Sequence, residues 1–198
     1  DVTGVGTARG VLGASSYGGD KAIFGYGHTG SNVSMTNLVS NSGVVASDVT
    51  GVGTARYSLA AASYGTDKVI FGYGYVSGAV SMTNLVNNSG VVSADVTGVG
   101  TARYALAAAS YGTDKAIFGY GTTGSVVSLT NLVSNSGVVA TDTTGVGTAR
   151  SDLAAASYGT DKAIFGYGYT GSNVSMTNLV SNSGVVASDV TGVGTARY

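Results

Sequence analysis

Residues 103–149 read RYALAAASYGTDKAIFGYGTTGSVVSLTNLVSNSGVVATDTTGVGTA, and closely similar stretches of 47 residues occur four times along the 198-residue chain. A nonapeptide, Asp-Val-Thr-Gly-Val-Gly-Thr-Ala-Arg, marks the period. Its copies begin at Asp1, Asp48, Asp95 and Asp189, with a one-residue variant at Asp142. Self-similarity at a period of about 20 to 50 residues is typical of repeat architectures, in which each unit buries its apolar face against its neighbours.

Each unit contains four runs with strand character, separated by turn residues. In the quoted unit the runs are 104–111, 115–120, 125–133 and 138–144. They are rich in Val, Ile, Thr, Tyr or Phe, which favour strands, and the Gly, Asn and Asp between them supply turns. The Ala-rich first run has helix propensity, but a Gly follows within eight residues, so no helical period develops. The sequence therefore predicts an all-β protein.

Four short antiparallel strands per unit and four units per chain predict a β-propeller of four-stranded blades, with one unit per blade. The expected blades are 9–55, 56–102, 103–149 and 150–196, and residues 1–8 duplicate the outer strand at 189–196. Either copy of that strand is expected to pair into the last blade. We expect a closed four-bladed ring; the alternatives are two chains in an eight-bladed ring, with a homodimer formed by ring closure or strand exchange, and a β-solenoid.

The order of elements within a unit resembles kelch repeats. An Arg (Arg103) precedes a small-residue run, Leu106–Ala109, and an aliphatic-aromatic run, Ile117–Gly121, ends in glycines. The amino-acid sequence of the repeat is also similar to tandem repeats in structural proteins of marine bacteriophages. The resemblance implies a propeller on a virion surface or tail fibre. Within it, the Arg of each unit is expected to pair with the Asp of a fourth strand across the blade junction.

Composition excludes several classes of function. A net charge of −1 is not the basic footprint of a nucleic-acid-binding protein, and the absence of Cys excludes disulfides and thiolate metal sites. No window holds about 18 unbroken apolar residues, so no membrane span is expected. The sequence starts inside a repeat, and no signal peptide is visible. We expect no cofactor and no bound metal.

Catalytic constellations are also missing from the sequence. His28 is the only His, so a Ser nucleophile has one potential base, and no Cys is available. Every Asp except Asp152 belongs to a repeated position, whereas catalysis requires differentiated residues. The Gly-Val-Gly-Thr-Ala-Arg run lacks the Gly-Lys-Ser/Thr ending of a phosphate loop. We therefore expect that the chain is not an enzyme.

Tyrosine is the residue type that suggests a binding surface, with 13 Tyr and no Trp in the chain. A Tyr near a blade rim packs its ring and offers its hydroxyl, and aromatic faces beside Asn and Asp suit sugars. The candidate ligand-binding residues are Tyr26, Tyr73, Tyr75, Tyr120, Tyr167 and Tyr169. We expect a non-enzymatic interaction module for a glycan or host-surface receptor. The alternative is a purely structural, recently amplified scaffold without its own ligand.

Overall fold

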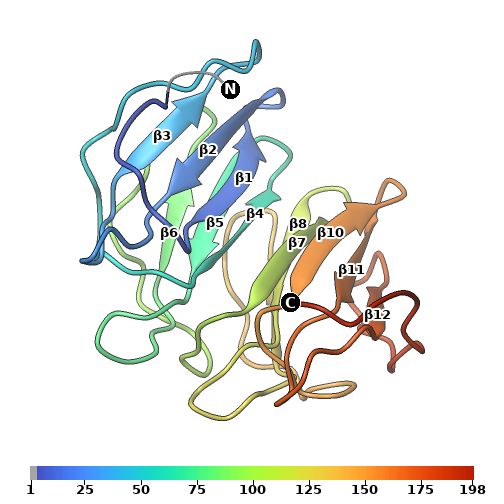
Figure 1. Cartoon of the computed structure of the whole chain (residues 1–198). Helices are drawn as coiled ribbons and strands as arrows, with labels where there is room; N and C mark the ends of the chain where they lie inside the picture. Colours follow the sequence, from blue (N-terminus) through green and yellow to red (C-terminus); the bar gives the residue numbers. More distant parts are fainter. Residues whose placement is uncertain (1–3) are drawn as a thin grey trace.

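The computed structural model describes residues 4–198, which form twelve β-strands and no helix, and so no helix that could cross a membrane (Figure 1). Each repeat contributes three strands. They are β1 (Gly13–Tyr17), β2 (Lys21–Gly25), β3 (Thr36–Val39), β4 (Ala60–Tyr64), β5 (Lys68–Gly72), β6 (Thr83–Val86), β7 (Ala107–Tyr111), β8 (Lys115–Gly119), β9 (Thr130–Val133), β10 (Ala154–Tyr158), β11 (Lys162–Gly166) and β12 (Thr177–Val180). The all-β prediction and the fourfold repeat are confirmed.

Each repeat forms its own three-stranded antiparallel sheet, with the strands in chain order and the second strand in the middle. In the third sheet, β7 pairs with β8 from Ala107 opposite Gly119 to Tyr111 opposite Lys115. The turn between them holds Gly112 and Thr113 at positive φ, 59° and 70°. Two consecutive residues at positive φ give a tight hairpin a twist that matches its strands. Among the described residues no sheet closes into a barrel.

The fourth run of each repeat lies beside the third strand but does not become a continuous strand. In the third repeat it makes two isolated bridges, Val133 to Val139 and Thr130 to Thr143. The bridged stretch of the fourth run is one residue longer than the stretch of β9 opposite it, so the ladder contains a bulge. The side chain of Asn131 fills the bulge by donating to the carbonyl of Ala140, 3.0 Å away. The expected four-stranded sheet is therefore three-stranded with a bridged fourth segment.

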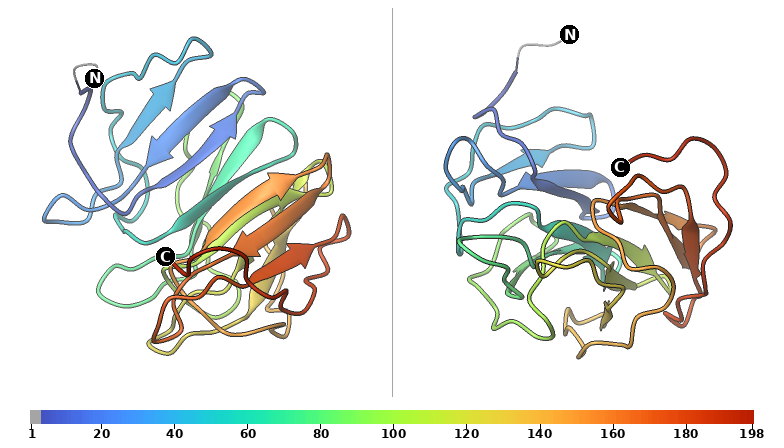
Figure 2. Two further views of the ribbon diagram at one scale, coloured as in Figure 1. Left: turned by 45° about the vertical axis from the view of Figure 1, so that its right-hand side comes forward. Right: turned by 60° about the horizontal axis from the view of Figure 1, so that its bottom comes forward.

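Neighbouring sheets pack face to face, with the first strands side by side in the order β1, β4, β7 and β10 (Figures 1 and 2). The small residues of these strands allow the close approach. Farther out, the fully buried rings of Phe71, Phe118 and Phe165 fill the space between sheets. Each ring lies against a Gly of the preceding sheet; a Cβ on Gly72, for example, would be 2.6 Å from Phe118. Packing between repeats therefore builds the core.

The four repeats form an open arc and not the closed four-membered ring that was expected (Figure 2). The ring of Phe24, in the first sheet, is 37% exposed, whereas the equivalent Phe71 is fully buried. At the other end, four of the five residues of β10 are exposed. The Ala contacts near the axis and the Phe contacts farther out fix the angle between neighbours, and three such steps do not return the fourth sheet to the first.

The two copies of the duplicated segment are held by different repeats. The C-terminal copy stays on the fourth repeat, where Val190 bridges Thr177. In the N-terminal copy, Thr7 donates from its backbone N–H and its hydroxyl to Asp48 of the first repeat, at 2.9 and 2.7 Å. Residues 1–3 of this copy lie outside the described residues. The last sheet therefore pairs with the C-terminal copy.

Candidate functional site

A ladder of backbone hydrogen bonds joins the four repeats at the end where their first strands begin. One residue of each repeat takes a left-handed conformation there, with φ between 52° and 55°: Val11, Ser58, Ala105 and Asp152. The N–H of Ser58 donates to the carbonyl of Val11, Ala105 to Ser58, and Asp152 to Ala105, at 2.9 to 3.0 Å. Left-handed non-Gly residues persist only where the surroundings hold them, and here the ladder does so.

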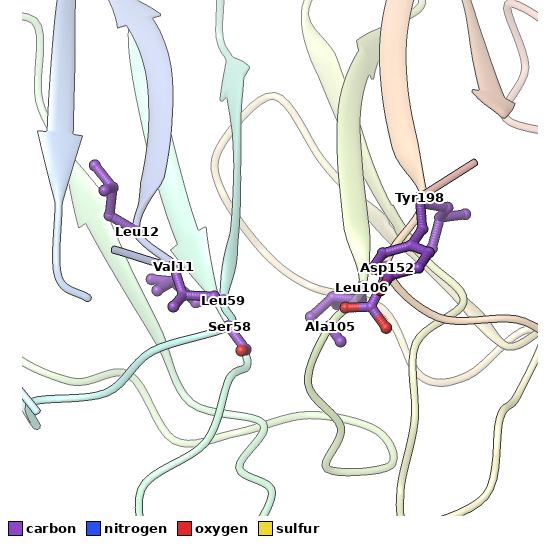
Figure 3. A pocket seen from close by; sticks show the side chains of 9 residues that line it. Val11, Leu12, Ser58, Leu59, Ala105, Leu106, Asp152 and Tyr198 are labelled. Atoms are coloured by element: carbon purple, nitrogen blue, oxygen red, sulfur yellow. The ribbon is translucent and has the colours of Figure 1, made fainter. Parts of the chain in front are cut away.

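The ladder surrounds a surface hollow of about 330 Å³ (Figure 3). It is lined by Val11, Leu12, Ser58, Leu59, Ala105, Leu106, Asp152, Leu153 and Tyr198. Its walls are largely aliphatic, and Asp152 is the one carboxylate among the lining residues. The hydroxyl of Ser151 donates to this carboxylate at 2.7 Å. Asp152 and Ser151 depart from the repeat, so they distinguish one side of the hollow from the other.

A buried Arg stands at each junction between repeats. In the second repeat, Arg56 donates to the carbonyl of Tyr73 at 2.8 Å and to the side chain of Asn84 at 2.7 Å. Its guanidinium lies 4.3 Å from the ring centre of Tyr26 in the preceding repeat and 4.0 Å from the carboxylate of Asp95. The expected Arg–Asp pairs are present in all four repeats, but each pair joins two residues of one repeat and does not cross the junction as predicted. The pairs are Arg9–Asp48, Arg56–Asp95, Arg103–Asp142 and Arg150–Asp189, at 3.7 to 4.0 Å.

The junction also shifts the pKa of its acids. Burial acts to raise the pKa of Asp95, but hydrogen bonds from Thr54 and Asn84 and the nearby Arg56 lower it below its usual value. Burial raises the pKa of Tyr26 to about 12, against the opposing effect of Arg56. The phenol therefore stays neutral and the carboxylate charged at neutral pH.

The structure separates the six candidate tyrosines into two groups. The rings of Tyr26, Tyr73 and Tyr120 are fully buried at the junctions, and their hydroxyls donate to backbone carbonyls. Tyr167 occupies the same position in the last repeat and is only half-buried. Tyr75 and Tyr169 lie in the loop after the second strand, and Tyr169 is 39% exposed. A ligand can contact a ring only where the ring is accessible. Of the six tyrosines, Tyr75 and Tyr169 combine an accessible ring with a position in a loop.

Tyr75 belongs to a row of aromatic rings that crosses three repeats next to the ladder. The rings of His28 and Tyr57 lie 5.3 Å apart, those of Tyr57 and Tyr75 5.5 Å, and those of Tyr75 and Tyr104 4.9 Å. Each member is half-buried, so each ring keeps an accessible part. The row ends at Tyr104, because the two positions that would continue it are Thr122 and Ser151.

Sequence reasoning did not include Tyr57, Tyr104 or His28 among the candidate ligand-binding residues. The missed signal was the Tyr that directly follows the Arg in two repeats. The residue at that position forms a β-bridge with a residue in the loop after the second strand, as Tyr57 does with Tyr75. Residues 18 positions apart are thereby paired across the same end of the sheet. A separate pair, Tyr169 and Tyr198, has ring centres 5.8 Å apart at the end of the arc.

The remaining chemistry of the described residues is limited. No three His, Asp or Glu side chains among residues 4–198 are grouped so that they could hold a metal ion. Three of the four repeated Asp-Lys turns form ion pairs on the surface, such as Lys68 with Asp67 at 2.9 Å. No protein-family model matches the chain, and a search of curated proteins found no similar sequence. The candidate site is therefore defined by the hollow and the aromatic row.

Proposed function

We propose that the four sheets are blades of a kelch-like propeller and that the chain is a non-enzymatic interaction module. Three observations support the propeller: the side-by-side first strands, the ladder around the hollow, and the repeated Phe-to-Gly packing between sheets. In such a fold each sheet, together with its bridged fourth segment, is one blade. The blades provide a rigid support on which loop residues are held in place.

The observation that carries the binding role is the unbroken aromatic row formed by His28, Tyr57, Tyr75 and Tyr104. Half-exposed aromatic rings offer an apolar face and a polar edge, which suits the alternating apolar and hydroxyl surfaces of a glycan. Because the row crosses three repeats, it presents several similar contacts in sequence. Weak equivalent contacts bind a repeating ligand through avidity. We propose a surface glycan as the ligand, consistent with a role on a virion surface or tail fibre.

The test is a binding screen of the multimerised chain against a glycan array and intact bacterial surfaces. We expect saturable binding that free sugar competes away. Tyr75→Ala should weaken this binding by about 5- to 30-fold, since one aromatic contact contributes on the order of 1–2 kcal/mol. Tyr169→Ala is the matched control, because Tyr169 occupies the same repeat position outside the row. Equal losses in both variants would contradict the row as the site.

A second candidate function is a structural scaffold without a ligand. The observation that favours it is the near-identity of the repeats, in which the same Arg, Tyr and Asn positions are buried in the contacts within and between repeats. Absence of binding across a broad panel, with the wild-type chain folded and multimerised, would support this role instead.

A further inference from the structure

At each of the three junctions, the Phe of the later repeat fills the same place on the earlier repeat. The Phe rings lie against Gly25, Gly72 and Gly119, and their centres are 5.1 to 5.3 Å from those of Tyr26, Tyr73 and Tyr120. We call this place the Phe seat: the middle-strand Gly, the Tyr that follows it, and the small residues of the first strand. Three independent copies show which side chain the seat accepts.

The fourth repeat carries the same seat on its open face. It is a hollow of about 180 Å³ whose lining includes Ala154, Ala156, Ile164, Gly166 and Tyr167. A Cβ placed on Gly166 would meet only a Thr177 methyl, at 3.4 Å. On the equivalent Gly119, the same Cβ would be 2.6 Å from the ring of Phe165. The seat is therefore formed and accessible at this end of the arc.

The first repeat carries the side chains that fill such a seat. Phe24 is exposed, and Leu12 is only half-buried, whereas its equivalents Leu59, Leu106 and Leu153 are buried. A Cβ on Gly43 would meet nothing within 4 Å. The equivalent Gly90 lies against Tyr17 and Leu38 of the preceding repeat. The partners that Gly43 would need, Tyr158 and Leu179, are exposed on the fourth repeat.

Backbone groups at the two ends match in the same way. At the internal junctions the N–H of Gly18, Gly65 and Gly112 donates to the carbonyl of Asp67, Asp114 and Asp161, each at 2.7 Å. Among the described residues the equivalent Gly159 makes no such bond. Its repeat-equivalent acceptor is the carbonyl of Asp20, on the open face of the first repeat. The ends therefore complement each other in shape, apolar surface and hydrogen bonding.

We propose that the two open faces bind each other between two copies of this chain, which close a ring of eight repeats. Phe24 of each copy occupies the Phe seat of the other, and Leu12 packs on the partner's Tyr167. A head-to-tail interface either closes or forms open filaments. Two copies form the smallest assembly in which no face stays open. A two-chain ring is favoured over larger rings because the fewest chains lose translational freedom when it forms. This self-association does not depend on glycan binding.

The C-terminal residues compete with this association. At an internal junction, the carbonyl of Arg56 accepts from the N–H of Gly27, and its guanidinium stacks on Tyr26. In the fourth repeat, Arg197 makes the same two contacts, with the N–H of Gly168 at 3.0 Å and with the ring of Tyr167 at 3.9 Å. This is the position that Arg9 of the incoming copy must take. Arg197 and Tyr198 must therefore leave before the ring closes.

The first experiment measures mass against concentration, by sedimentation or native mass spectrometry. We expect a species of twice the 19.4 kDa chain mass. Phe24→Ala should raise the dissociation constant by about 30-fold per interface, as expected for a buried aromatic anchor. Gly166→Ala should abolish the dimer, because its Cβ meets the incoming ring. Deleting residues 197–198 should lower the dissociation constant about tenfold, since a stacked Arg contact is lost from the competing state.

Matched controls keep the result interpretable. Val91→Ala alters a 62%-exposed side chain within the arc and should leave the mass unchanged. Thermal unfolding should show that Phe24→Ala and Gly166→Ala fold as well as the wild type, since neither change touches an internal junction. A chain that stays monomeric up to millimolar concentration, or a dimer that Gly166→Ala leaves intact, would overturn the proposal.

A cross-linking experiment tests ring closure itself. At internal junctions the hydroxyls of Ser16 and Ser63 lie 3.0 Å apart, and Ser157 of one copy should face Ser16 of the other in the same way. The chain has no Cys, so the double variant Ser16→Cys, Ser157→Cys introduces the only thiols. Under mild oxidation a closed ring gives covalent dimers and no larger species. A ladder of longer oligomers would refute closure, and no cross-linked product would refute the interface.

Discussion

Replacing Arg56 with Met tests whether the junction network holds the repeats together. Methionine keeps part of the aliphatic stem but removes donors to Tyr73, Thr54 and Asn84 and the stacking on Tyr26. Removing one partner of a buried charged network costs about 3–5 kcal/mol, because the remaining polar groups stay buried without partners. Stacking adds on the order of 1 kcal/mol. We therefore expect the free energy of unfolding to fall by about 4–6 kcal/mol.

The assay is urea unfolding followed by circular dichroism, at a concentration where the chain is monomeric. Arg197→Met is the matched control, because the exposed Arg197 stacks on Tyr167 as Arg56 stacks on Tyr26, but among the described residues its side chain donates to no group besides the carbonyl of Thr195. It should cost on the order of 1 kcal/mol, the contribution of the stacking alone. A loss below about 1.5 kcal/mol for Arg56→Met, or equal losses for the two variants, would refute the reasoning.

Three further predictions follow from the junctions. Gly119→Ala should destabilise the chain by about 1–3 kcal/mol in the same urea assay, because its Cβ would lie 2.6 Å from Phe165; unchanged stability would show that the seat is loose. Below about pH 4 stability should fall, because hydrogen bonds lower the pKa of Asp95 and Asp142 in the folded state, so the unfolded chain binds protons first. A free energy of unfolding that does not change as the pH falls below about 4 would contradict this. Between about pH 10 and 12 stability should also fall, because burial raises the pKa of Tyr26 and Tyr73 to about 12 and the unfolded phenols ionise first. A free energy of unfolding that stays constant across this range would contradict it.

The repeat and the strand pattern could be predicted from the sequence because both are local. Lys115–Gly119 holds the adjacent Ile117 and Phe118, it follows the turn residues Gly112–Asp114, and the same pattern recurs every 47 residues. The broken fourth strand could not be predicted, because it depends on the side chain of Asn131 filling a bulge. That contact joins residues on different strands and leaves no periodic signal in either strand.

The candidate site was predicted only in part, for a similar reason. Tyr75 stands out in a variable loop, but Tyr57 and Tyr104 become its neighbours only when the loop bridges the start of the first strand. Tyr26 has the same composition signal as Tyr75, yet it is buried under an Arg of the next repeat. Composition does not distinguish a Tyr that faces solvent from one that faces the neighbouring sheet.

The open arc could not be read from the sequence because identical junctions do not specify how many repeats close a ring. That number depends on the angle between neighbouring sheets, which the contacts of Ala, Phe and Gly set together. In the structure the four repeats do not close a ring, because Phe24 stays exposed at one end and the Phe seat of the fourth repeat stays accessible at the other.

The most direct test of this account uses the four phenylalanines of the chain as reporters. Fluorine NMR of the chain labelled with 4-fluorophenylalanine should show three lines insensitive to solvent isotope and one sensitive line in dilute solution. Phe24→Leu should remove the sensitive line, and raising the concentration should move it toward the three buried ones. Four solvent-insensitive lines from the monomer would mean that the four repeats close on themselves, and would contradict the open arc and its self-association.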